Sequence, residues 1–123
     1  MTKTFLAIFI GGGLGSVMRY GVQLLLHERI TAYHFPWATF CINITGSFLI
    51  GLFYGLSAKF NLPGDVRLLL TAGLCGGFTT FSTFSNDIVE MTRQGDWTGT
   101  LTYIILSIVI GALACMAGSF ISK

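Results

Sequence analysis

Four long stretches of the chain carry almost no charge, and they limit the fold more than any other feature of the sequence. Three of them contain no Asp, Glu, Lys or Arg: Phe35–Ala58, Leu68–Asn86 and Trp97–Ser122. The fourth, Thr4–Leu26, contains one charged residue, Arg19. An α-helix rises about 1.5 Å per residue, so about 20 apolar residues cross the hydrocarbon core of a bilayer. The sequence therefore predicts four transmembrane helices, at about residues 4–26, 35–58, 66–92 and 97–122.

The composition agrees with a protein that lies almost entirely in the membrane. Of the 123 residues, 53% are hydrophobic and only 10% are charged, against about 25% charged residues in a typical soluble domain. The predicted loops are too short to hold a soluble domain, so residues 1–123 are expected to form a single all-α membrane domain. The first span contains Arg19 and is not followed by a clear cleavage site, which favours a retained helix over a signal peptide.

Several classes of function are not favoured by the sequence. The net charge of +2 is too small to indicate a nucleic-acid partner. Cys41, Cys75 and Cys115 lie in three different spans without a CxxC pair, which favours packing over a metal or redox site. The run GGGLG at Gly11–Gly15 does not complete a phosphate-binding motif and is more typical of helix packing. With no nucleophile–base pair in the sequence either, we do not expect an enzyme.

The charges at the ends of the spans show little preference for one side of the membrane. With four spans, both termini are expected on one side. That side would hold Lys3, Lys59, Arg67 and Lys123, and the other side Arg29 and Arg93, with Arg19 closer to the second side. Orientation normally follows a clear excess of Lys and Arg on the cytoplasmic side. The weak excess here predicts insertion in both orientations, and therefore an antiparallel homodimer.

Small residues recur at every fourth position in three of the spans. This spacing lets two helices approach closely, either within one chain or between two copies. The patterns are Gly11/Gly15, Ser47/Gly51/Gly55 and Ser107/Gly111/Cys115/Ser119.

The third span contains GGFTTFSTFS, Gly76–Ser85, which has more hydroxyl groups than a lipid-facing helix needs. The glycines at 73, 76 and 77 predict a helix break near the middle of the membrane, with the second half starting near Thr79, whose hydroxyl would cap it. The first half would then end in free carbonyl groups, which favour a cation. The alternative is a glycine kink in which the hydroxyl groups bond back to their own helix.

A helical wheel drawn through this segment separates two kinds of side chain. Phe78, Phe81 and Phe84 fall on one arc, and most of the hydroxyl groups fall on the opposite arc. Polar groups inside a membrane are functional candidates by default. The interior offers mainly donors, while Asp87 and Glu90 are expected where the third helix leaves the membrane. Donors favour an anion as the ligand.

Arg19 has two interpretations that the sequence leaves open. Its charge could form an electropositive vestibule that attracts anions. It could instead extend to the membrane interface or pair with carboxylates in the loops.

Three segments together resemble the CrcB/Fluc family of fluoride channels, and the resemblance covers the whole chain. They are GGGLG at Gly11–Gly15 followed by Arg19-Tyr20, PWATFCIN at Pro36–Asn43, and GGFTTFSTFS at Gly76–Ser85. The last is the most specific. Ala38 differs from the glycine that the family often has, and it is expected to change only local packing.

The resemblance implies an assembly and an ion pathway. It implies an antiparallel, dual-topology homodimer in the cell inner membrane, with two fluoride pathways and a structural sodium ion on the dimer axis. By the motif, the backbone carbonyls of Gly76 and Thr79 would hold the sodium ion. Phe81 and Phe84 would line the fluoride path together with the pore asparagine, Asn43. Further polar contacts would come from Thr39, Ser82, Thr83, Tyr103 and Ser107.

The expected function is passive export of fluoride from the cytoplasm. Fluoride is small and strongly hydrated, so it needs protein donors to replace its lost water. The amide of Asn43 and the hydroxyl of Tyr103 are such donors, and the positive edges of phenyl rings also attract anions. A coupled transporter of the multidrug-exporter type is the main alternative, although the sequence shows no mid-membrane glutamate. A structural membrane protein without transport activity is a second alternative.

Overall fold

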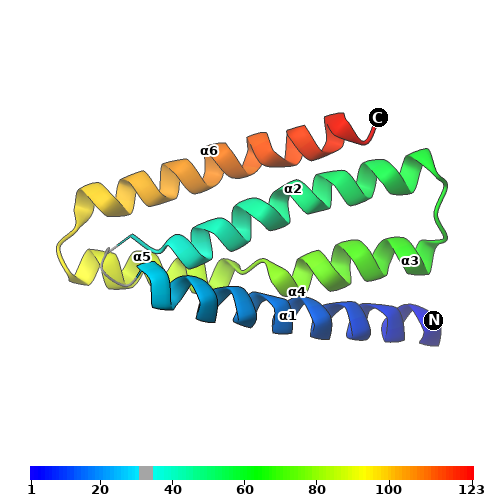
Figure 1. The fold of residues 1–123 in the computed structure, drawn as a ribbon, viewed down its shortest axis with the longest axis horizontal. Coiled ribbons are helices and arrows are strands. Elements are labelled where there is room, and N and C mark those ends of the chain that lie inside the picture. The colour runs from blue at the N-terminus through cyan, green and yellow to red at the C-terminus, as the bar shows by residue number, and fades with distance from the viewer. Residues whose placement is uncertain (31–34) are drawn as a thin grey trace.

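The computed structural model describes residues 1–30 and 35–123, and these form only helices and their connections (Figure 1). Four segments are long enough and apolar enough to cross a membrane: Thr2–Leu26, Trp37–Lys59, Gly64–Arg93 and Trp97–Ile121. This confirms the four-span prediction. The side chain of Arg29, one of the cations counted above, lies outside the described residues.

The first, second and fourth spans are single helices, and the third is interrupted. The single helices are α1 (Thr2–Ile30), α2 (Trp37–Lys59) and α6 (Trp97–Ile121). The third span consists of α3 (Gly64–Leu68), the π-helical segment η1 (Leu69–Cys75), α4 (Gly76–Phe78) and α5 (Phe81–Arg93). Both termini and the α2–α3 connection lie at one end of the bundle, and the α5–α6 connection lies at the other (Figure 1).

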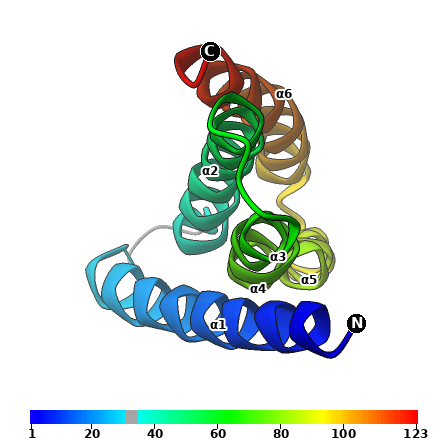
Figure 2. The same cartoon turned by 90° about the vertical axis from the view of Figure 1, so that its right-hand side faces the viewer.

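The interrupted third helix lies between α1 on one side and α2 with α6 on the other (Figures 1 and 2). Large apolar side chains remain exposed along α1 and α6, such as Phe9, Val17, Ile108 and Phe120. These outward faces are typical of helices in contact with lipid, because a bilayer covers exposed apolar surface that water would disfavour.

Glycines bring the backbone of α1 against the third helix. A β-carbon at Gly11 would overlap the Leu69 carbonyl, and one at Gly15 would overlap the Leu74 carbonyl. From the other side, a β-carbon at Gly77 would overlap the Gly12 carbonyl. The run Gly11–Gly15 therefore packs two helices of the same chain together, as small residues do in membrane bundles.

The other small-residue patterns join α2 to α6. A β-carbon at Gly51 would overlap the Cys115 carbonyl, and one at Gly118 would overlap the Phe48 carbonyl. Residues of these two patterns therefore contact each other within the chain, as Gly51 and Cys115 show, and Gly118 adds a contact outside the predicted spacing.

The third helix is broken, as predicted, but at a different place. The backbone leaves the helical conformation at Thr79 (φ −78°, ψ 157°) and Thr80 (φ −147°, ψ 118°). The glycines expected to form the break remain helical in η1 and α4. Gly73 and Gly77 make close contact with α1, a function that the sequence alone does not separate from unwinding, whereas Gly76 is exposed.

Two further details of the prediction change with the position of the break. Thr80, not Thr79, is the N-cap residue of α5. Phe78 lies before the break and is buried, so it does not share a helical face with Phe81 and Phe84. A continuous helical wheel is not valid across two extended residues.

The glycine contact predicts different effects for two neighbouring substitutions. Gly15→Ala should lower the free energy of unfolding by about 1–3 kcal/mol, because the added methyl group overlaps the backbone of the third helix. Gly13→Ala is the matched control, since no atom of the described structure lies within 4 Å of a β-carbon there. It should be neutral or stabilise the helix by up to about 1 kcal/mol. Thermal unfolding of both variants in detergent measures the difference, and equal stabilities would contradict the contact.

Candidate functional site

The break leaves amide and carbonyl groups without their usual helical partners. In an α-helix each carbonyl accepts from the amide four residues later. The amide of Thr80 instead donates to Oδ1 of Asn43 at 2.8 Å, and the amide of Thr83 donates to Oγ1 of Thr80 at 3.1 Å. Side chains have therefore replaced backbone carbonyls as acceptors.

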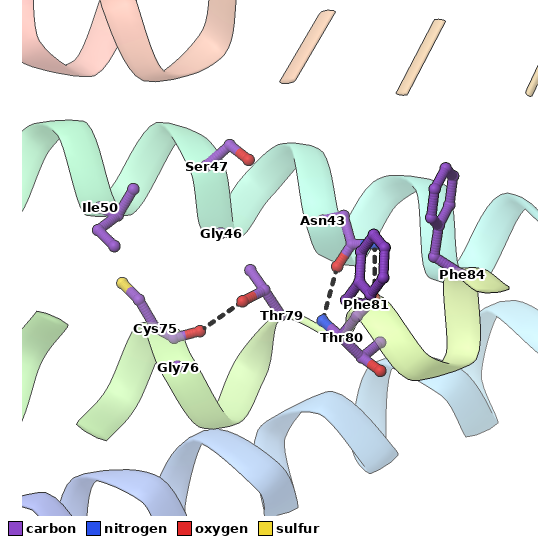
Figure 3. Close-up of a pocket in the computed structure, with 10 residues that line it drawn as sticks. All are labelled: Asn43, Gly46, Ser47, Ile50, Cys75, Gly76, Thr79, Thr80, Phe81 and Phe84. Atoms are coloured by element: carbon purple, nitrogen blue, oxygen red, sulfur yellow. Dashed lines mark hydrogen bonds between the residues drawn. The ribbon is translucent and has the colours of Figure 1, made fainter. Parts of the chain in front are cut away.

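Asn43 of α2 holds the break through two hydrogen bonds. Its Oδ1 accepts from the Thr80 amide, and its Nδ2 donates to the Thr80 carbonyl at 3.0 Å (Figure 3). The orientation of the side-chain amide is fixed, because a backbone N–H must face oxygen and a carbonyl must face N–H. One of the two Asn43 donors predicted for the ion is thus used by the backbone, and one N–H remains.

The hydroxyl groups after the break form the cap of α5. The Thr80 hydroxyl donates to Oγ1 of Thr83 at 3.0 Å and lies 3.4 Å from Oγ of Ser82. The Thr79 hydroxyl instead donates to the Cys75 carbonyl at 2.8 Å. Both interpretations of the hydroxyl-rich segment hold in part, because the helix is broken and one hydroxyl bonds back to its own helix. Thr80 is a site residue that the sequence analysis missed.

Three carbonyl groups at the break remain free. Arg19 donates from Nε to the Gly77 carbonyl at 3.0 Å, and Asn43 occupies the Thr80 carbonyl. The helical partner of the Gly76 carbonyl, the Thr80 amide, donates to Asn43 instead, and the extended Thr79 and Thr80 separate the Phe78 carbonyl from its partner in α5. Among the described residues, the Thr79 carbonyl accepts no hydrogen bond. Free carbonyls at the C-terminal end of a half-helix are the groups that hold small cations in other membrane proteins.

A groove of about 330 Å³ lies between α2 and the break (Figure 3). It brings together five residues predicted for the site from separate parts of the sequence. These are Asn43, Gly76, Thr79, Phe81 and Phe84. None of the residues that line it is charged.

The two phenyl rings belong to different environments. The side chain of Phe81 is 79% exposed in the single chain. Phe84 is less exposed and lies 6.0 Å from Phe81 between ring centroids. Phe84 also lies 5.0 Å from the ring of Tyr103 on α6, so it joins the groove to the interior of the bundle.

Tyr103 does not line the groove, and its hydroxyl already has an acceptor. The side chain is fully buried, and the hydroxyl donates to Oδ2 of Asp87 at 3.0 Å. Asp87 is a second residue that the sequence analysis missed, because it was assigned to the membrane exit of the third helix. The spacing of three residues between Phe84 and Asp87, which places both on one face of α5, was the available signal.

The remaining predicted pathway residues lie outside the lining of the groove. Thr39 is buried on α2, Ser82 is exposed at the start of α5, and Thr83 is held in its cap. The Ser107 hydroxyl is buried and has no hydrogen-bond partner among the described residues. Ser107 follows Tyr103 by one helical turn, so a polar group without a partner continues from the tyrosine along one side of α6.

Arg19 contacts the break and pairs with none of the loop carboxylates whose side chains the structure describes. In the described part of the chain, the ion pair found is Arg93–Glu90 at 3.3 Å, which does not involve Arg19. The interpretation of Arg19 as a partner for loop carboxylates is therefore wrong for these residues. Its guanidinium group belongs to the site because it bonds the Gly77 carbonyl.

Comparison with known proteins finds similar sequences that align over nearly the whole chain. A sequence model described as "CrcB-like protein, Camphor Resistance (CrcB)" matches residues 6–119. A Phocaeicola vulgatus protein named "Fluoride-specific ion channel FluC" is 48% identical over 121 residues, covering 98% of this chain and 99% of its own. A Nitrobacter hamburgensis protein named "Fluoride-specific ion channel FluC 1" is 49% identical over 120 residues, with 96% and 94% covered. The similarity therefore extends over all four spans.

The two hydrogen bonds of Asn43 predict that replacing its amide by a carboxylate lowers the stability of the protein. Asn43→Asp keeps the acceptor for the Thr80 amide but places a carboxylate oxygen against the Thr80 carbonyl. The free energy of unfolding should fall by about 1–3 kcal/mol, because a hydrogen bond is replaced by a repulsion. Asn61→Asp makes the same chemical change at an exposed residue between α2 and α3 and should be nearly neutral. Thermal unfolding in detergent distinguishes the two, and equal stabilities would show that Asn43 does not hold the break.

Proposed function

The chain belongs to the CrcB family, and from this premise we propose that it is a fluoride-selective channel that lets fluoride leave the cytoplasm passively. The relatives that align with it over nearly their full length are named as ion channels. The protein is accordingly a channel and not an enzyme.

One observation carries the proposal: a groove without charged residues brings Asn43, Phe81 and Phe84 together at the helix break. Fluoride gives up its hydration water only where donors replace it. The free N–H of Asn43 is one such donor, and the two neighbouring rings offer positively polarised edges. We propose that fluoride passes this groove and continues along Tyr103 and Ser107, with Thr39, Ser82 and Thr83 as further polar contacts.

Passive flow needs no coupling group, and the groove has none. Fluoride accumulates in a cell because hydrogen fluoride crosses membranes and ionises in the less acidic cytoplasm. A channel then lets the anion leave down its electrochemical gradient. Asp87 is a carboxylate in contact with this proposed pathway, through its bond to Tyr103. It is the group that a proton-coupled transporter would use, so proton dependence is the relevant test of that alternative.

We further propose that two copies assemble as an antiparallel dimer with one fluoride pathway on each side. A single chain exposes Gly76, Phe81, Ser82 and Asn86 along the third helix. Exposed polar groups are unfavourable inside a bilayer and need a partner to cover them. A second copy in the opposite orientation is the partner that the weak charge bias of the sequence favours. The cell inner membrane is the location that the family resemblance implies.

A structural sodium ion between the two copies would use the free carbonyls. Gly76 and Thr79 line the groove. The helical partner of the Gly76 carbonyl donates to Asn43 instead, and the Thr79 carbonyl accepts no hydrogen bond from the described residues. Oxygen atoms suit a small, hard cation, but one chain offers too few of them to replace a hydration shell. Two chains meeting at their helix breaks would supply twice the number. The residues present therefore fit a shared sodium ion, whose charge would balance the carbonyl dipoles.

Fluoride release from liposomes tests the proposed function. Purified protein reconstituted into potassium fluoride vesicles should release fluoride rapidly when a potassium ionophore is added, and chloride should be retained. Phe81→Ile should abolish release, because an aliphatic side chain has no polarised edge to meet the anion. Phe9→Ile is the matched control, since Phe9 is 77% exposed and lies on α1, away from the groove. A fluoride electrode gives both rates.

Each opposite result would remove a different part of the proposed function. No fluoride release from folded wild-type protein would remove the channel proposal. Release that requires a proton gradient would favour a coupled transporter. Normal release from Phe81→Ile would leave the channel but remove the role of the ring.

The assembly is tested by labelling and by removing sodium. A cysteine at Lys123, in a chain whose Cys41, Cys75 and Cys115 are changed to Ala, should react with an impermeant maleimide from both sides of the membrane in about equal amounts. Reaction from one side only would contradict dual topology. Replacing sodium by N-methylglucamine should shift the protein from dimer to monomer in size-exclusion chromatography. An unchanged dimer would contradict the sodium site.

A further inference from the structure

One face of α1 has glycines beside the helical part of the third span and an arginine where the third helix unwinds. Gly11, Gly15 and Arg19 follow each other at intervals of four and so lie on the same side of the helix. At the first two positions, the backbone of the third helix leaves no room for a side chain. At the third position the chain has one of its longest side chains, and this side chain contacts the third helix at Gly77.

The carbonyl that Arg19 contacts has lost its helical partner. In a continuous helix the Gly77 carbonyl would accept from the amide of Phe81. Thr79 and Thr80 are extended, so that amide lies beyond the break. The Nε–H of Arg19 donates to the same carbonyl at 3.0 Å and takes the place of the missing amide.

The contact is held from both sides. A β-carbon at Gly77 would overlap the Gly12 carbonyl, so the backbones of α1 and α4 are in direct contact. On the other side of the break, Asn43 holds Thr80. The unwound segment is thus fixed by one side chain from α1 before the break and one from α2 after it.

We propose that Arg19 is a positioning residue that fixes the break through its Nε–H and occupies the Gly77 carbonyl, which is then not available to an ion. Among the described residues, the carbonyls at the break that have lost their helical partners and gained no side-chain donor are then those of Gly76, Phe78 and Thr79. In this role the donor at Nε matters, and the charge of the guanidinium group is secondary. The consequence for a cation rests on the sodium site proposed above, whereas the consequence for the break does not.

Three substitutions separate the donor from the charge. Arg19→Gln places an amide nitrogen the same number of bonds from the backbone as Nε, so it keeps the donor without the charge. Arg19→Lys keeps the charge but has a methylene group at that position. Arg19→Met has neither. If Arg19 acts only by attracting anions with its charge, Lys should be the better replacement. If Arg19 acts as a clamp, that is, by holding the break through its Nε–H, Gln should be the better replacement.

Amide hydrogen exchange of the full-length protein in detergent, measured by mass spectrometry over residues 79–85, tests the clamp without any ion flux. The Met and Lys variants should exchange roughly tenfold faster than the wild type, because the hydrogen bond to the Gly77 carbonyl is lost. The Gln variant should remain close to the wild type. If the Met variant cannot be recovered folded, the Gln and Lys variants decide alone.

A second readout connects the clamp to the cation. The sodium concentration that gives half-maximal fluoride release should rise in the Lys variant and stay near the wild-type value in the Gln variant. Exchange in the Gln variant as fast as in the Lys variant, or a Lys variant that behaves as wild type in both measurements, would overturn the proposal. If the wild type releases no fluoride, the proposed function fails and hydrogen exchange still decides the role of Arg19.

Discussion

The hydrogen bonds between Asn43 and the backbone of Thr80 are the interaction on which the rest of the site depends. A helix that unwinds inside a bilayer exposes amide and carbonyl groups, and each is costly without a partner. Asn43 satisfies one of each at the same residue. Arg19 and the Thr80 hydroxyl satisfy two more. Because those groups are satisfied, the carbonyls of Gly76, Phe78 and Thr79 can stay free for a ligand without making the break unstable.

The broken helix also explains how groups of opposite polarity lie close together. The half-helix that ends at Phe78 presents carbonyl oxygens, and the half-helix that begins at Phe81 presents amide hydrogens. Two extended residues separate them. A cation and an anion would therefore meet different ends of the same segment, and the uncharged groove avoids a fixed charge that would hold either ion too strongly. Selectivity in such a site depends on geometry and on the loss of hydration.

The sequence predicts the spans well and the break less well, for physical reasons. Charge-free runs measure hydrophobic length directly, so the four helices could be located from local information. Glycine has two uses in a membrane helix, unwinding and close contact, and Gly73 and Gly77 could not be assigned to the second without the position of α1. The cap at Thr80 depends on Asn43, which lies on another helix. The bond between Asp87 and Tyr103 likewise depends on how α5 meets α6. Asn43, Phe81 and Phe84 were found because the family resemblance identified them by motif.

The π-helical winding of η1 has a consequence for the length of the chain. A π-helix has more residues in each turn than an α-helix, and Leu69–Cys75 is wound in this way directly before the break. Two hydrogen bonds to α1 flank these residues, Thr4–Asp65 on one side and Arg19–Gly77 on the other, while the glycine contacts at Leu69 and Leu74 lie within them. We therefore expect that deletion of one residue within η1 could be absorbed by rewinding to an α-helix, with both hydrogen bonds in place and the glycine contacts at Leu69 and Leu74 shifted. The number of residues in η1 could thus change without a change in the distance between the two flanking hydrogen bonds.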